Sequence, residues 1–178
     1  MAEAVADCTL VVGTTAVKRR ELQHPLKELR GGASVIRKQL GSGRVALLFG
    51  SEKDGLSNAD LSHCHWLMRI PVREEHPSVN LGQAVALCLY ELARDPQTPR
   101  QSEKQKSATA GEVERITATL LDALSASGYL KPRSVAPTEE KIRRLVRRLN
   151  LSAADAKVWL GMLRQMVWKL HSSKNPGS

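Results

Sequence analysis

The chain has 178 residues, of which 27 are Lys or Arg and 18 are Asp or Glu, so its formal net charge is +9. This length allows one ordinary domain or two small ones of roughly 100 residues, and the positive charge favours an anionic partner such as nucleic acid or an acidic membrane surface. No stretch approaches the ~20 apolar residues of a membrane-spanning helix, and the N-terminus lacks a secretory pattern. We therefore expect a cytoplasmic protein that does not enter a membrane.

The charge is distributed unevenly along the chain. Residues 1–100 carry a net +2 and residues 101–178 a net +7. A polar segment with several prolines lies between them and predicts a linker over residues 96–111. We expect one domain over residues 1–95, a second over 112–170, and a disordered tail over 171–178.

Short apolar runs in the first domain predict buried strands at residues 9–12, 45–49 and 66–70. The first two runs are continuously apolar after Thr9 and end at Gly13 and Gly50, as is typical of parallel strands covered on both faces. A helix is predicted over residues 79–94, where apolar side chains recur at three- and four-residue spacing. Strands and helices that alternate in this way indicate an α/β domain.

The second domain has helical periodicity throughout and predicts a small bundle of three helices. The first covers residues 112–127 and ends at Gly128, which suits a left-handed C-terminal cap. Thr138 is the predicted N-cap of the second helix. Ser152 is the predicted N-cap of the third, with Asp155 as its capping partner.

Two loops are candidates for a binding site. Residues 49–57 run from a strand end into a polar turn that contains Gly50 and Gly55, and ligands bind at such strand ends in open α/β sheets. Polar residues also crowd before the predicted helix at 79–94, where Ser78 suits an N-cap and Asn80 a first-turn position. Each loop taken alone could be an ordinary connection, and the phosphate-binding P-loop pattern is not matched.

Taken together, these loops resemble a known family. The stretches FGSEKDGLS (49–57) and IPVREEHPSVNLGQAVALCLYEL (70–92) are similar to two motifs of the SPOUT superfamily, and specifically of the SpoU or TrmH family of RNA 2′-O-ribose methyltransferases. VVGTTA (11–16), SGYLKPR (127–133) and KIRRLVRRLNLSAADAKVWLGMLRQ (141–165) are similar to segments of the TrmJ-type branch. The resemblance covers nearly the whole chain.

This resemblance implies a trefoil-knotted parallel sheet, an exception to the rule that chains do not thread their own loops, followed by an all-α domain. It implies S-adenosylmethionine as cofactor, a homodimer, and RNA as partner, with the tRNA anticodon loop preferred over ribosomal RNA. The family's catalytic positions correspond to Glu52, Ser78 and Asn80. Its cofactor contacts correspond to Thr14, Thr15, Ala16, Gly50, Ile70, Pro77, Ser78 and Val79.

One family feature has no counterpart in this sequence: the first motif, which supplies a catalytic arginine. The sequence therefore leaves two alternatives open. Either the chain is a fragment of a longer methyltransferase, or it is a non-catalytic RNA-binding or cofactor-binding member of the family.

Two further clusters have competing interpretations. His63, Cys64 and His65 suggest a metal site, but no second ligand pair stands at the spacing that zinc sites use, so we expect no metal. Four arginines in the second helix of the second domain would usually be a solvated face. In a basic domain that accompanies an RNA-modifying one, they predict phosphate contacts; the residues are Arg143, Arg144, Arg147 and Arg148.

Overall fold

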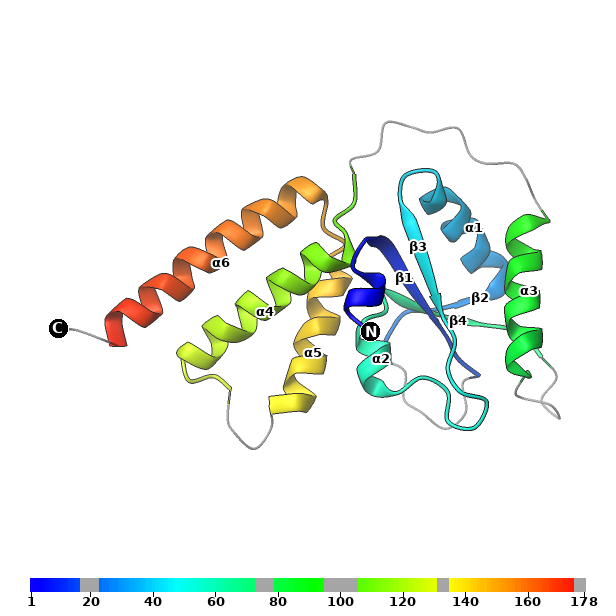
Figure 1. Ribbon diagram of the computed structural model, residues 1–178, viewed down its shortest axis with the longest axis horizontal. Helices are drawn as coiled ribbons and strands as arrows, with labels where there is room; N and C mark the ends of the chain where they lie inside the picture. Colours follow the sequence, from blue (N-terminus) through cyan, green and yellow to red (C-terminus); the bar gives the residue numbers. More distant parts are fainter. Residues whose placement is uncertain (17–22, 73–78, 95–105, 131–134, 175–178) are drawn as a thin grey trace.

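The computed structural model describes residues 1–16, 23–72, 79–94, 106–130 and 135–174. An α/β part lies beside a part made of three helices (Figure 1). The elements in chain order are η1 (Glu3–Val5), β1 (Cys8–Thr14), β2 (Leu26–Glu28), α1 (Leu29–Leu40), β3 (Arg44–Leu48), α2 (Asn58–Ser62), β4 (Trp66–Arg69), α3 (Leu81–Ala93), α4 (Ala110–Ala126), α5 (Val135–Arg148) and α6 (Ala153–Lys174).

The four described strands form one parallel sheet in the order β2-β4-β1-β3. The predicted α/β class and the three predicted strands are confirmed, while β2 and α1 were not predicted. The knot stays a prediction, because residues 73–78 lie outside the described ones. Strand β1 lies between β3 and β4, so these two consecutive strands lie on opposite sides of β1. Such a switch point is where open α/β sheets bind ligands.

The two inner strands, β1 and β4, are buried on both faces of the sheet, because successive strand residues point to opposite sides. Strand β3 is half-buried and β2 is exposed. Val12, Trp66 and Met68 face a core that includes residues of α1 and α3. Val11 and Leu67 face the other core, which includes Leu61 of α2 and Ala110 of α4. In Figure 1, α1 and α3 accordingly lie on one side of the sheet, and α2 and α4 on the other.

Helices α4, α5 and α6 enclose a core of their own. Gly128 follows α4 with φ of +79°, as its predicted capping role requires. Ser152 and Asp155 form the predicted pair, with the Asp155 amide donating to Ser152 Oγ at 3.1 Å. The prediction for Thr138 is wrong, since α5 begins at Val135 and contains Thr138. Pro137 is tolerated there because first-turn amides have no partner within a helix.

The three-helix part packs directly against the sheet. The amide of Gly111, in the first turn of α4, donates to the carbonyl of Ala6 at 2.8 Å. Helix α6 continues to Lys174, so part of the expected tail is helical. No helix among the described residues is long and apolar enough to cross a membrane. Cys8, Cys64 and Cys88 are free and buried, and burial raises the pKa of the Cys64 thiol to about 12.

Candidate active site

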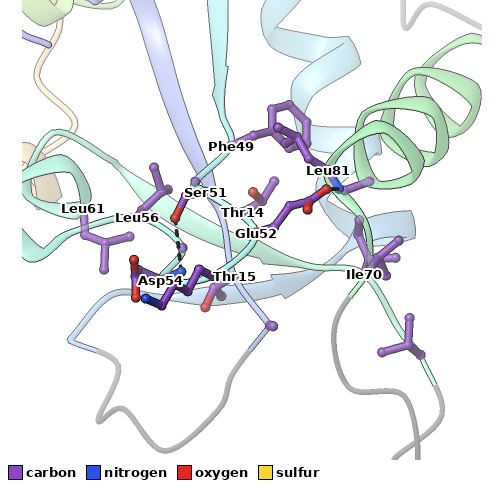
Figure 2. Close-up of a pocket in the computed structure, with 17 residues that line it drawn as sticks. Thr14, Thr15, Phe49, Ser51, Glu52, Asp54, Leu56, Leu61, Ile70 and Leu81 are labelled. Carbon is purple, nitrogen blue, oxygen red and sulfur yellow. Dashed lines mark hydrogen bonds between the residues drawn. The ribbon is translucent and has the colours of Figure 1, made fainter.

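A cavity of about 280 Å³ opens at the carboxyl ends of β1, β3 and β4 (Figure 2). Its volume is close to the lower end of the ~300–1,000 Å³ typical of small-molecule sites. The segments that follow β1, β3 and β4 line it, together with Leu61 of α2 and the chain at the start of α3. The lining residues are Thr14, Thr15, Ala16, Phe49, Gly50, Ser51, Glu52, Lys53, Asp54, Gly55, Leu56, Leu61, Ile70, Val72, Val79, Leu81 and Ala84.

The end of β1 is held between its two neighbours in the sheet. Thr14 Oγ1 donates to the carbonyl of Leu48 in β3 at 3.0 Å. The amide of Thr15 donates to the carbonyl of Met68 in β4 at 3.0 Å. These bonds hold the chain where it leaves the sheet, at the point where Thr14 and Thr15 line the cavity.

The loop after β3 closes on itself through two glycines. The Gly55 amide donates to the carbonyl of Ser51 at 2.9 Å, and Gly55 has φ of +72°. A Cβ at Gly50 would lie 2.0 Å from the carbonyl carbon of Gly55. No side chain fits at Gly50, so the loop can close in this way only with a glycine there. Gly50 also lines the cavity.

Glu52 and Asn80 meet above the cavity. Asn80 Nδ2 donates to Glu52 Oε1 at 2.7 Å, and the Leu81 amide donates to the same oxygen at 3.2 Å. Figure 2 shows Glu52 directed toward Leu81 at the start of α3. Asn80 is the N-cap of α3, because its Oδ1 accepts from the Gly82 amide at 2.9 Å. The expectation that Asn80 lies in the first turn of the helix is therefore wrong.

Most of the residues taken from the family resemblance lie together here. Thr14, Thr15, Ala16, Gly50, Glu52, Ile70 and Val79 line the cavity, and Asn80 contacts Glu52. Pro77 and Ser78 lie outside the described residues. The resemblance did not identify the apolar wall made by Phe49, Leu56, Leu61, Val72 and Leu81. Their arrangement around one cavity depends on how distant segments meet, which no local pattern encodes.

The four arginines of α5 have different surroundings. Arg147 is 1% exposed and donates to Glu114 Oε2 at 3.4 Å, and Arg143 pairs with Glu114 at 3.0 Å. Arg144 pairs with Glu140 of the same helix at 3.7 Å, whereas Arg148 is exposed. Burial lowers the pKa of Arg147, and the Glu114 carboxylate opposes that shift. Arg148 is thus the one exposed arginine of these four, and the phosphate contacts expected of them stay a prediction.

The residues His63, Cys64 and His65 are buried in the core. His65 Nδ1 accepts the amide of Val11 at 3.1 Å, and burial lowers the His65 pKa to about 4. His63 Nδ1 lies 3.8 Å from Glu114 Oε2, and burial also lowers its pKa. No group of three candidate metal ligands occurs among the described residues.

Comparison with known proteins adds independent information. Residues 1–90 match the SpoU rRNA Methylase family. A tRNA (cytidine/uridine-2'-O-)-methyltransferase TrmJ from Cronobacter sakazakii is 32% identical, over 97% of this chain and 71% of that protein. The protein of the same name from Photorhabdus laumondii is 32% identical, over 90% of this chain and 68% of its own length. The crystal structure of TrmJ from Z. mobilis ZM4 has a TM-score of 0.81 at 29% identity, covering 93% of this chain and 70% of that one.

Proposed function

This chain belongs to the SpoU rRNA methylase family, and from that premise we propose that it transfers a methyl group from S-adenosylmethionine to a ribose 2′-hydroxyl of RNA. The observation that carries the proposal is the cavity at the strand ends with the Glu52–Asn80 pair at its rim. The relatives that cover nearly the whole chain are named as tRNA methyltransferases. We therefore favour tRNA over ribosomal RNA, and the anticodon loop within it.

The chemistry of the cavity suits S-adenosylmethionine. Apolar walls from Leu56, Ile70 and Leu81 would enclose an adenine ring. Gly50 lines the cavity without a side chain, which allows close approach of the polar parts. When bound, this cofactor supplies a methyl group that is open to attack by an oxygen nucleophile. Residues Thr14, Thr15, Ala16 and Val79 would complete the contacts, together with Pro77 and Ser78 by family resemblance.

Glu52 and Asn80 would position the ribose. The Glu52 carboxylate accepts two hydrogen bonds at Oε1, from Asn80 Nδ2 and from the Leu81 amide, which fixes its orientation. Its Oε2 accepts none among the described residues, so it could accept the hydrogen bond of a ribose hydroxyl. Holding that hydroxyl in line with the methyl carbon is a large part of the rate in such a transfer. Ser78 is assigned to the same site by resemblance alone.

Arg148 would contact the RNA backbone. It is exposed on α5, in the half of the chain that carries most of the positive charge, and exposed arginines bind phosphate with strong salt dependence. Arg143, Arg144 and Arg147 face carboxylates instead and are not part of this proposed contact. A cytoplasmic location is part of the same proposal, because a tRNA substrate and buried free thiols both fit it.

The protein would act as a homodimer through α3. Cys88 and Leu92 of this helix pack toward the sheet, but Leu87, Leu89 and Tyr90 are 41%, 57% and 65% exposed. A helix that is apolar on all sides requires burial on all sides. Leu81 of the same helix lines the cavity, so a second copy on this face would lie next to the site.

A second candidate is a member of the family that binds the cofactor and RNA without transfer. The observation that favours it is that Lys53 is the only cationic side chain among the described residues that line the cavity. Among these described residues, the family's catalytic arginine has no counterpart. This chain spans about 70% of the length of the relatives compared above, so its activity has to be measured.

Two assays separate the candidates. Calorimetric titration with S-adenosylmethionine tests the cavity, and transfer of a labelled methyl group to unmodified tRNA tests the activity. A methylated 2′-hydroxyl makes the adjoining phosphodiester resistant to alkali, so an alkali-resistant labelled dinucleotide identifies the product. Cofactor binding without a labelled product would favour the non-catalytic candidate. Absence of cofactor binding would refute both.

A further inference from the structure

Helix α2 lies between the cavity and the three-helix part. Leu56, just before the helix, and Leu61, within it, both line the cavity and are buried. Ser57 caps the helix, with the Asp60 amide donating to Ser57 Oγ at 3.1 Å. The opposite side of α2 packs against α5. A short helix of this kind has little stability of its own, so its position depends on the packing on both sides.

Glu114 of α4 and Arg143 of α5 form the polar centre of this packing. Arg143 Nε donates to Glu114 Oε1 at 3.0 Å and to Oε2 at 3.2 Å. Buried Arg147 donates to Glu114 Oε2 at 3.4 Å and to the Ala110 carbonyl at 3.5 Å. The Arg143 side chain is 17% exposed, so this ion pair is partly shielded from water and salt.

The same arginine also reaches α2. Arg143 Nη1 donates to Ser62 Oγ at 3.4 Å, and the Ser62 hydroxyl in turn donates to the Ala59 carbonyl at 2.7 Å. Ser62 is fully buried and directly follows Leu61 of the cavity wall. One guanidinium therefore joins α4 to α2 through different nitrogens, which the fork geometry of arginine allows and a lysine ammonium does not.

We propose that Arg143 is a positioning residue for the cofactor cavity: held by Glu114, it fixes α2 and with it the wall formed by Leu56 and Leu61. The inference rests on the proposed function for the identity of the cofactor. It assigns the three-helix part a second role besides RNA contact, because the cavity wall would depend on it. It also gives Arg143 a role different from the phosphate contact that the sequence suggested.

The test compares Arg143→Gln, Arg143→Lys and a control, Lys141→Gln, in the full chain. Lys141 is exposed on the same helix, so its replacement removes a charge without touching α2. Hydrogen exchange is measured at the amides of Leu61, His63 and Cys64, which bond within and just after α2. Affinity for S-adenosylmethionine and for tRNA is measured in parallel, the latter at several salt concentrations.

We expect Arg143→Gln to speed exchange at these amides and to weaken S-adenosylmethionine binding by about tenfold, the scale of a lost charge-assisted hydrogen bond. Arg143→Lys keeps the charge but cannot hold both partners, so it should show most of the same defect. Lys141→Gln should match the wild type in exchange and cofactor affinity. Ser62→Ala removes the acceptor on α2 and should show the same exchange defect. It serves as the test if Arg143→Gln does not fold.

Wild-type exchange at α2 in Arg143→Lys and Ser62→Ala would overturn the inference. So would an Arg143→Gln protein that loses tRNA affinity and salt dependence while its cofactor affinity is unchanged, because Arg143 would then be a phosphate ligand. If the wild type binds no S-adenosylmethionine, the proposed function fails, and the exchange measurement still decides whether Arg143 fixes α2.

Discussion

Glu52 Oε1 and Asn80 Nδ2 lie 2.7 Å apart, although 28 residues separate them in the chain. Asn80 uses both ends of its amide: Nδ2 holds the carboxylate, and Oδ1 caps α3 by accepting the Gly82 amide. The start of α3 and the polar rim of the cavity are therefore one structural feature. The dual use of Asn80 allows its structural and functional roles to be separated by substitution.

Asn80→Asp keeps the acceptor that caps α3 but removes the donor to Glu52 and places a second carboxylate beside the first. We expect α3 to remain capped, since Asp caps as well as Asn, while methyl transfer falls at least tenfold because Glu52 is repelled. Asn80→Ala should lose the transfer and also about 1 kcal/mol of stability. Transfer rates and urea denaturation check both expectations.

Ser152→Ala provides the control, because it removes the cap of α6 far from the cavity. It should lower stability as Asn80→Ala does and leave transfer unchanged. Equal transfer by Asn80→Asp and the wild type would remove Asn80 from the site.

Gly50→Ala tests whether the cavity needs bare backbone in the loop after β3. Its Cβ would meet the backbone of Gly55 at 2.0 Å, so the loop must move and cofactor affinity should fall by more than tenfold. Gly161→Ala is the control, because a Cβ at Gly161 of α6 has nothing within 4 Å. It should raise stability by roughly 0.5–1 kcal/mol. Unchanged cofactor affinity in Gly50→Ala would contradict the assignment of this loop.

The sequence predicted those parts of the fold that depend on residues close together in the chain. Short apolar runs identified β1, β3 and β4, and Gly128 and Ser152 were recognised as caps because capping involves residues a few positions apart. Strand β2 was missed because all three of its residues are exposed. Helix α1 contains Gly31 and Gly32, which disfavour helices, yet Gly32 is needed because a Cβ there would press on Met68 and Trp66.

The sequence predicted which residues form the candidate site, but not which of them contact one another. The family resemblance placed Glu52 and Asn80 in one site, whereas their direct hydrogen bond appears only in the fold. The burial of Arg147 could not be read from an arginine-rich helix, because it depends on Glu114, 33 residues away in another helix. Charged residues are almost never fully buried unless paired, and pairing across that distance is a tertiary property.

Arg148→Gln tests the RNA contact assigned to α5. Losing one phosphate contact should weaken tRNA binding and reduce its salt dependence by about one unit of log–log slope. Arg144→Gln is the comparison, because Arg144 pairs with Glu140 within its own helix, and it should leave the slope unchanged. An equal effect of the two substitutions would show that α5 acts through total charge.

His65 predicts how stability depends on pH. Its pKa is lowered to about 4, first by burial and then by the charge of Arg147, whereas the unfolded chain has a value near ~6.5. The unfolded state thus binds more protons between these values, so stability is lost as pH falls from about 6.5 through 4. The difference corresponds to roughly 3 kcal/mol when complete. His24 and His63, whose pKa values burial also lowers, contribute with the same sign.

Denaturation by urea at several pH values checks this dependence. His65→Asn retains an acceptor near the position of Nδ1 for the Val11 amide, and it should flatten the curve. His171→Gln, at an exposed histidine beside Asp122, should not. An unchanged curve in His65→Asn would assign the acid sensitivity to other groups.

Leu89→Arg tests the homodimer proposed for α3. Leu89 is 57% exposed, so a single copy of the chain should tolerate arginine there with little change in its own folding. A charge buried between two copies without a partner is strongly unfavourable, so sedimentation should show a dimer for the wild type and a monomer for the variant. Leu145→Arg, at a leucine 51% exposed on α5, should remain dimeric. Leu81 of α3 lines the cavity, so loss of the dimer should also lower methyl transfer. A fully active Leu89→Arg monomer would show instead that each copy carries a complete site.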